Sequence, residues 1–170
     1  MGCKILIYGY GNPGRQDDGL GNAMVDTIED WALNENIQNI EFESNYQLNI
    51  EDAATISDKD LVIFIDASVE NIKDFQITPV NSSTKVTFTS HAASPGYIVG
   101  LCRELYGKTP AVYLLHIKGY QWDFREGLSE KAKKNLETAA DILKKKLRHP
   151  EKLINHFEKV NNDSIKLVNT

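Results

Sequence analysis

The 170-residue chain is long enough for one domain with a well-buried core, and its composition, 41% hydrophobic and 25% charged, is that of an ordinary globular protein. A formal net charge of −5 argues against nucleic acid as a partner, and no stretch approaches the roughly 20 apolar residues that a membrane span needs. Two cysteines are too few for a disulfide framework. We therefore expect a cytoplasmic, monomeric protein without membrane association, with one domain over residues 1–150 and an extension over 151–170.

The first half of the chain alternates between predicted strands and helices. The segments are 4–8 (strand), 19–31 (helix), 40–42 (strand), 50–56 (short helix) and 61–65 (strand). Leu20, Met24 and Ile28 recur at helical spacing, which predicts a helix with one apolar face. The unbroken apolar run 61–65 is typical of a strand buried on both faces in a parallel sheet.

The second half continues this alternation, with strands at 75–80, 85–89 and 111–117 and helices at 95–106 and 129–147. Pro79 interrupts the first of these strands, which favours an edge position or a loop. Ser94 before Pro95 is a good helix start, and Ser129 can cap the last long helix.

After Arg148 the pattern weakens. Leu153, Ile154 and Phe157 predict one short amphipathic helix, and residues 161–170 predict a poorly ordered tail. As a whole, the order of elements predicts a three-layer α/β protein, with a doubly wound, mostly parallel sheet covered by helices on both faces.

Three side chains with metal-binding chemistry, Asp18, Asp66 and His91, each follow a predicted strand. The carboxyl ends of parallel strands share one edge of the sheet, so these residues can converge there. Two carboxylates and an imidazole suit a divalent ion. Each residue taken alone also has a structural explanation. Asp18 could stabilise the start of a helix through its charge, Asp66 could cap a turn, and His91 could be a hydrogen-bonded structural histidine.

Residues 9–21 contain three glycines in the G-x-G-x-x-G spacing of dinucleotide-binding turns. Pro13 removes one amide from that turn, and the charges of Asp17 and Asp18 would repel a diphosphate and attract a cation. We therefore favour a cation site over a nucleotide site, and a non-catalytic metal- or nucleotide-binding module stays as an alternative.

Taken together, these motifs resemble the nickel–iron hydrogenase maturation endopeptidases, which remove a carboxyl-terminal extension from the precursor of the hydrogenase large subunit. The resemblance spans about residues 4–147. It rests on four segments: Gly9 to Asn12 leading to Asp17, Asp18, Gly19 and Gly21; Val62 to Ala67; His91 followed by Ser94 and Pro95; and Gly127 to Ser129. It implies the phosphorylase/hydrolase-like form of the predicted sheet.

The resemblance also implies roles for individual residues. Asp18, Asp66 and His91 become the metal ligands and the catalytic residues, and the metal is nickel already inserted in the precursor, with other divalent ions as substitutes in vitro. The family usually has Glu at the first position, so Asp18 shortens the reach by one methylene and the choice between Asp17 and Asp18 stays open. Gln47 becomes a candidate substrate contact, although a plain polar loop residue is an equal alternative.

A metal in such a site could polarise the scissile carbonyl or lower the pKa of a bound water, with Asp66 or Asp18 as proton acceptor. Neither cysteine has a neighbouring histidine in the motifs, so we exclude a thiol protease. In the segment 116–127, the aromatic side chains either hold the precursor or pack the loop, and we expect at least one to pack. His116 either extends the metal shell or is structural.

One rival shares the opening residues, because Gly-Asn-Pro-Gly after an apolar strand also resembles the peptidyl-tRNA hydrolases. Those enzymes need a histidine that residues 16–22 do not supply. The acidic charge of the chain also opposes binding of tRNA.

Overall fold

The computed structural model describes residues 2–83 and 93–168. The predicted strand 85–89 and the predicted ligand His91 lie outside the described residues. None of the described helices is both long enough and apolar enough to cross a membrane.

A mostly parallel sheet organises the fold. Over the described residues it has five strands in the order β2-β1-β3-β5-β4. They are β1 (Ile5–Tyr10), β2 (Ile40–Asn45), β3 (Leu61–Ser68), β4 (Phe75–Pro79) and β5 (Ala111–Lys118). Among these strands only β4 runs antiparallel, and it lies at the edge of the sheet next to β5. An edge strand tolerates Pro79 because a proline has no N–H to donate to a second neighbouring strand.

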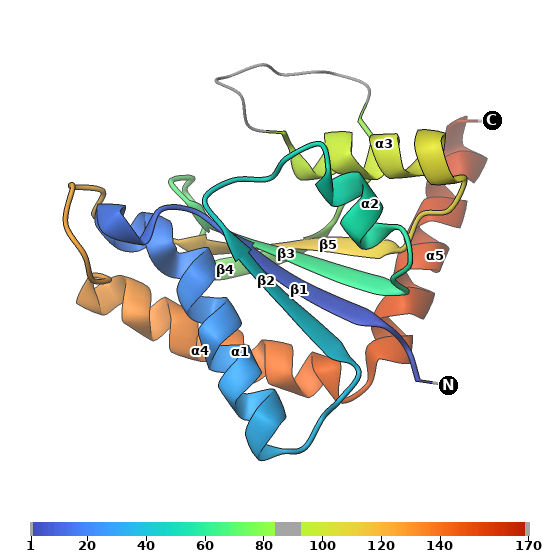
Figure 1. The fold of residues 1–170 in the computed structure, drawn as a ribbon. Coiled ribbons are helices and arrows are strands. Elements are labelled where there is room, and N and C mark those ends of the chain that lie inside the picture. The colour runs from blue at the N-terminus through green and yellow to red at the C-terminus, as the bar shows by residue number, and fades with distance from the viewer. Residues whose placement is uncertain (1, 84–92, 169–170) are drawn as a thin grey trace.

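Helices cover both faces of this sheet, as Figure 1 shows. They are α1 (Leu20–Asn34) and α4 (Glu130–Leu147) on one face, α2 (Asp52–Ile56) and α3 (Pro95–Tyr106) on the other, and α5 (Pro150–Val168) across the end near the amino terminus. A 3-10 segment, η1 (Pro13–Gly19), joins β1 to α1. The predicted three-layer, doubly wound α/β fold is confirmed.

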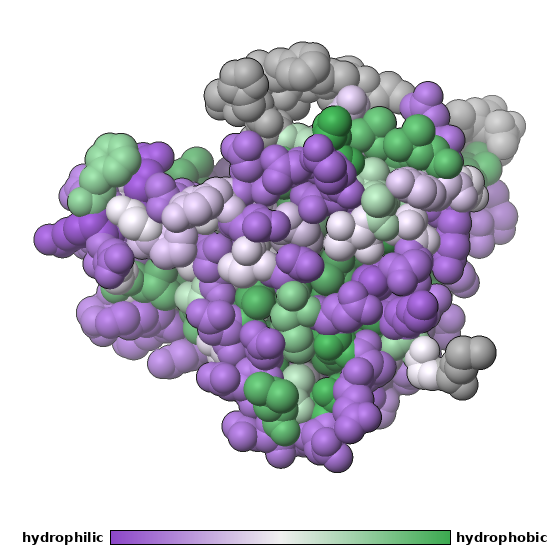
Figure 2. Space-filling view, in the orientation of Figure 1, coloured by the Kyte–Doolittle hydropathy of each residue, from purple (hydrophilic) through white to green (hydrophobic). Residues whose placement is uncertain are grey.

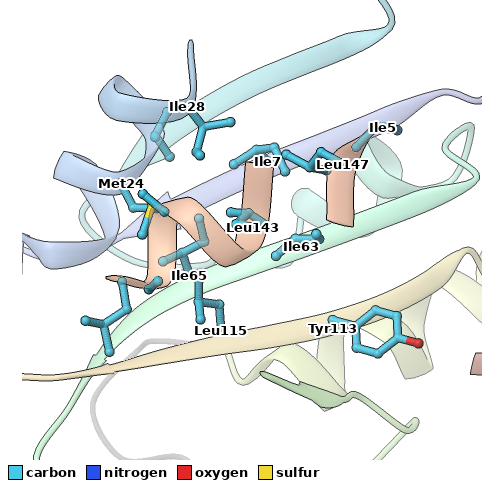
Figure 3. Packing of buried hydrophobic residues seen from close by; sticks show 14 of the residues in the cluster. Ile5, Ile7, Met24, Ile28, Ile63, Ile65, Tyr113, Leu115, Leu143 and Leu147 are labelled. Atoms are coloured by element: carbon cyan, nitrogen blue, oxygen red, sulfur yellow. The ribbon is translucent and has the colours of Figure 1, made fainter. Parts of the chain in front are cut away.

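The core consists of two layers because the central strands are buried on both faces. One set of alternating strand residues, including Ile5, Ile7 and Ile63, packs against α1 and α4 (Figure 3). The intervening residues, such as Tyr8 and Phe64, face α2 and α3. This alternation decides which side chains of β1, β3 and β5 share a face at the ends of the strands.

The carboxyl-terminal helix α5 is longer than the short helix that the sequence predicts. Leu153 is buried in the core layer on the α1 and α4 face, and the Phe157 ring lies 5.8 Å from the Tyr113 ring. The prediction of a poorly ordered tail is wrong for residues 161–168, which belong to α5. Once the first half of a helix is held by packing, each further residue adds one main-chain hydrogen bond, so the helix can continue through polar residues.

Two glycines bring α1 into direct contact with the sheet. A Cβ atom on Gly21 would lie 2.5 Å from the carbonyl oxygen of Ile65, and one on Gly9 would overlap the carbonyl oxygen of Gly21. The first turn of α1 therefore rests on the main chains of β1 and β3 with no side chain between them.

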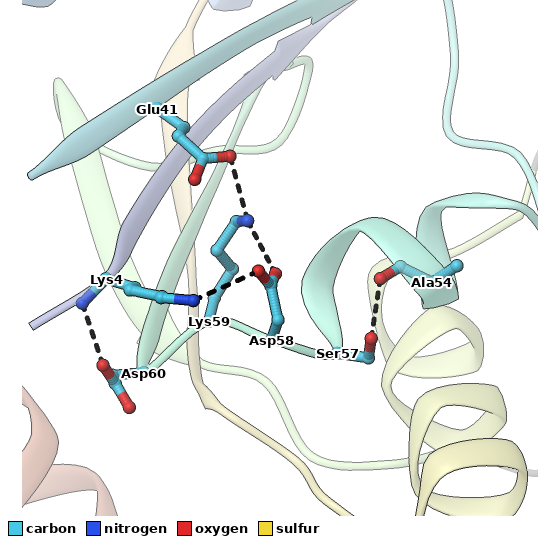
Figure 4. A network of polar contacts seen from close by, with 7 residues as sticks. All are labelled: Lys4, Glu41, Ala54, Ser57, Asp58, Lys59 and Asp60. Carbon is cyan, nitrogen blue, oxygen red and sulfur yellow. Dashed lines mark hydrogen bonds and ion pairs between the residues drawn. The ribbon is translucent and has the colours of Figure 1, made fainter.

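At the opposite end of the strands, a buried lysine joins the loop before β3 to strand β2 (Figure 4). The Lys59 Nζ lies 2.6 Å from Asp58 Oδ1 and 2.9 Å from Glu41 Oε2, and its side chain is only 6% exposed. Burial lowers the pKa of Lys59, but its two carboxylate partners outweigh this and raise the pKa.

We expect Lys59→Met to change the free energy of unfolding by less than about 1 kcal/mol, because the desolvation cost of a buried ion pair largely offsets its attraction. Lys59→Ala should cost about 2 kcal/mol, because it also removes the packed aliphatic stem. Urea denaturation of both variants measures their unfolding free energies. Equal losses would contradict the view that the Lys59 stem contributes more to stability than its charge.

Candidate active site

Asp17 is a structural residue that ties η1 to the loop between β5 and α4. Its carboxylate is fully buried. It accepts hydrogen bonds from the Tyr120 N–H (2.7 Å), the Gln121 N–H (2.9 Å), and both the N–H and the hydroxyl of Ser129 (2.7 Å each). Burial raises the pKa of Asp17, but these hydrogen bonds outweigh it and lower the pKa below its usual value.

Gln16 strengthens the same connection. Its Nε2 donates to Gln121 Oε1 at 3.0 Å, its Oε1 accepts from the Asp123 N–H at 3.1 Å, and its own N–H donates to the Arg125 carbonyl at 2.9 Å. Its φ of 48° and ψ of −115° lie in a region that favours glycine, so these bonds hold a strained backbone just before the acidic pair. The 119–129 loop is thus fixed at its base.

Asp18 is the acidic residue of the pair that remains available for chemistry. Its side chain is partly exposed, and one oxygen, Oδ2, accepts from the Asn12 N–H at 3.0 Å. Because the Asp17 carboxylate is occupied by four donors, the geometry favours Asp18 over Asp17 as the metal ligand.

Asp66 lies beside Asp18 at the carboxyl edge of the sheet. The sequence predicts that the strand ends at Ile65, but β3 continues to Ser68, so Asp66 lies within the strand and its side chain is on the α2 and α3 face. Burial and the charge of Asp18 raise the pKa of Asp66 to about 7, although the Ala67 N–H and the Tyr10 hydroxyl, which donate to the carboxylate, lower it.

Tyr10 is a further residue of this edge, and the sequence motifs do not identify it. It is the last residue of β1 and occupies the same face as Asp66, and its hydroxyl is hydrogen-bonded to the Asp66 carboxylate. Burial and that carboxylate keep the pKa of Tyr10 well above its usual value, so the phenol stays a donor. A tyrosine between two glycines after an apolar strand was the available signal.

His116 is the neighbour of Asp66 on β5, because the two are register partners on the same face. Burial lowers the pKa of His116, although Glu70 raises it. Its Nε2 lies 3.5 Å from the Thr78 hydroxyl, toward β4. Within residues 2–83 and 93–168, no three acidic, histidine or cysteine side chains are close enough to hold one ion, and the third predicted ligand, His91, lies outside these residues.

Gln47 is exposed in the loop after β2, at the same edge of the sheet. This loop has a buried anchor: the Tyr8 hydroxyl donates to Asp52 Oδ2 at 2.9 Å, and the Asn49 N–H donates to the same oxygen at 2.7 Å. Leu48 is buried beneath the loop. Gln47 is therefore an exposed residue of a loop that is anchored on both sides.

The aromatic residues of the 119–129 loop divide as the sequence analysis expects. The Trp122 ring lies against Gly119, and the Tyr120 hydroxyl accepts a hydrogen bond from Asn135 Nδ2 at 3.0 Å, so both pack the loop. Phe124 is different, because its side chain is 85% exposed.

Neither cysteine has the environment of a nucleophile. Burial raises the pKa of both the Cys3 and the Cys102 thiols, although Lys108 lowers that of Cys102. The Cys102 Sγ lies 3.1 Å from the Lys108 carbonyl oxygen within the fold. A raised pKa leaves little reactive thiolate at neutral pH, which agrees with the exclusion of a thiol protease.

Comparison with known proteins supports the resemblance. No protein-family model matches the chain. In sequence it is 26% identical over 149 residues to a Methanocaldococcus jannaschii protein with the name "Putative hydrogenase maturation protease", covering 82% of this chain and 93% of that protein.

Hydrogenase maturation proteases of known structure have the same fold as this chain. The chain superposes on the [NiFe] hydrogenase maturation protease HycI from Thermococcus kodakarensis with a TM-score of 0.67 at 20% identity, covering 86% of this chain and 93% of that one. For the hydrogenase maturating endopeptidase HybD from E. coli, the TM-score is 0.64 at 20% identity, with the same coverage. Similarity to hydrogenase maturation proteases is thus confirmed in sequence and in fold, and a peptidyl-tRNA hydrolase is not favoured.

Proposed function

We propose that this chain is an endopeptidase that removes the carboxyl-terminal extension of a nickel-loaded [NiFe]-hydrogenase large-subunit precursor, and that it works as a cytoplasmic monomer. The observation that carries this proposal is the pair Asp18 and Asp66, which lies at the carboxyl edge of a sheet with the fold of hydrogenase maturation proteases. Two partly buried carboxylates this close repel each other, and a cation between them would relieve that repulsion.

In this proposal the nickel ion arrives as part of the substrate, and Asp18, Asp66 and His91 bind it. The bound ion would polarise the scissile carbonyl or activate a water molecule. With a pKa near 7, Asp66 is suited to accept a proton at neutral pH whenever it is not tightly coordinated. Tyr10 orients the Asp66 carboxylate through its hydrogen bond, and Gln47 is the proposed contact to the precursor chain.

Incubation of the purified chain with nickel-loaded and nickel-free precursor tests the proposal. We expect a loss of the extension, seen as a mass shift, only with the loaded form. Asp18→Asn and Asp66→Asn should each lower the cleavage rate at least about 100-fold, because each removes a charged ligand.

Asp30→Asn is the matched control, because Asp30 is an exposed carboxylate on α1 and should leave cleavage unchanged. Cleavage of nickel-free precursor, or full activity in both site variants, would reject this assignment. Nickel binding without any cleavage would instead support the non-catalytic module.

A further inference from the structure

Three loops at the carboxyl edge of the sheet expose large apolar side chains. Among the described residues, the most exposed large hydrophobic side chains are Phe124 (85%), Val69 (77%) and Tyr46 (73%). They follow β5, β3 and β2, respectively, so they come from different loops around one edge, the edge that holds Asp18 and Asp66 (Figure 1). Exposed apolar side chains on three loops of one edge offer apolar contact area to a partner that binds there.

Phe124 is the most distinctive of the three, because its loop is rigid. The hydrogen bonds of Gln16 and Asp17 fix the base of the 119–129 loop, and the Trp122 ring packs inside it against Gly119. Figure 2 shows a small apolar area bordered by polar surface at the corner of the molecule where Figure 1 draws this loop. A side chain presented on a fixed loop loses little conformational entropy when it binds a partner.

Arg15 adds a charge to this apolar contact. Its guanidinium carbon lies 5.0 Å from the centre of the Phe124 ring. The Arg15 Nε is buried without a hydrogen-bond partner among the described residues, and Nη2 makes only a 3.5 Å contact with the Trp122 carbonyl. An arginine whose guanidinium lies over an exposed aromatic ring combines two residue types that are enriched at interface hot spots.

We propose that Phe124 and Arg15 form the docking point for the folded body of the precursor, which presents an apolar patch carrying a carboxylate. This inference rests on the proposed function. Arg15 lies three residues before Asp18 in η1, so the pair adjoins the proposed cleavage site, where the folded body of the precursor has to dock. The pair sets affinity for the precursor and takes no part in the chemistry.

Steady-state cleavage of the nickel-loaded precursor by Phe124→Ala and Arg15→Ala tests the inference. We expect KM to rise about tenfold in each variant with kcat unchanged, because docking acts before the chemical step. Added salt should raise KM for the wild type and have little effect on Arg15→Ala. Leu33→Ala is the matched control, because Leu33 is 72% exposed at the far end of α1, and it should leave KM unchanged.

The unfolding temperature of each variant is measured alongside. Phe124→Ala should leave it unchanged, because the side chain is exposed. An unchanged KM in Phe124→Ala would overturn the inference, as would a wild-type dimer in sedimentation that this substitution dissolves. If the wild type does not cleave the precursor, the proposed function fails, and calorimetric titration with the same precursor then tests the docking inference. Binding that Phe124→Ala weakens supports the inference. Absence of binding, or binding that Phe124→Ala does not change, overturns it.

Discussion

Asp66→Asn is expected to stabilise the metal-free protein while it removes cleavage. In the folded chain the pKa of Asp66 is raised from 3.8 to about 7, so between these values the folded state binds more protons than the unfolded state. The stabilisation from the protonated carboxyl is therefore complete below pH 3.8 and is lost as the pH rises through about 7. Asn keeps the neutral form at every pH, so we expect a gain of about 1–3 kcal/mol near pH 8 and almost none near pH 4.

Urea denaturation with a chelator present, at both pH values, measures this difference. Asp18→Asn is a useful companion, because removing its charge lowers the pKa of Asp66 and should give a smaller gain with the same pH dependence. A gain that does not depend on pH, or a loss at the higher pH, would contradict the assigned pKa of Asp66. Such a gain on loss of activity is the expected sign of a site built for a ligand.

Asp17→Ala is expected to have the opposite effect, with a loss of about 3–4 kcal/mol, because it leaves three main-chain N–H groups and one hydroxyl without their acceptor and empties a buried position. The stabilisation by Asp17 is present above its usual pKa of 3.8 and is lost as the pH falls through the lower folded value. The loss should therefore be constant through neutral pH.

Asp18→Ala, one residue further on, should change the unfolding free energy by less than about 1 kcal/mol, since its only hydrogen bond within the described chain is to a loop N–H. The contrast between the two variants, read from denaturation curves in the same buffer, decides which aspartate is structural. A larger loss for Asp18→Ala would exchange the two roles.

Most of the fold could be predicted from local patterns. Unbroken apolar runs marked β1 and β3, Ser94 and Ser129 marked the starts of α3 and α4, and Pro79 marked the edge strand β4. These signals are local because caps, prolines and buried strands impose their constraints within a few residues. The extent of α5 was missed, because it depends on packing against β5, which periodicity in a polar segment does not reveal.

The candidate site was harder to predict. Its edge of the sheet followed from the topology, and the placement of Asp18 near Asp66 agrees with it. The sequence did not predict that Asp17 is structural and Asp18 is available. This difference depends on hydrogen-bond donors more than 100 residues away, in the loop before α4. The hydrogen bond from Tyr10 depends on the register of β1 and β3, which the tyrosine between two glycines does not reveal by itself.

The contact between Gly9 and Gly21 fixes the position of α1 against the sheet. Since main chain rests on main chain there, α1 cannot move closer to the sheet, and a methyl group at either position would push it outward together with η1. The spacing of the two carboxylates is thus set by a pair of residues that have no side chains. A site whose geometry is fixed by main-chain contact cannot adjust the distance between its acidic groups by moving the helix, so only the side chains of Asp18 and Asp66 can move to fit a ligand.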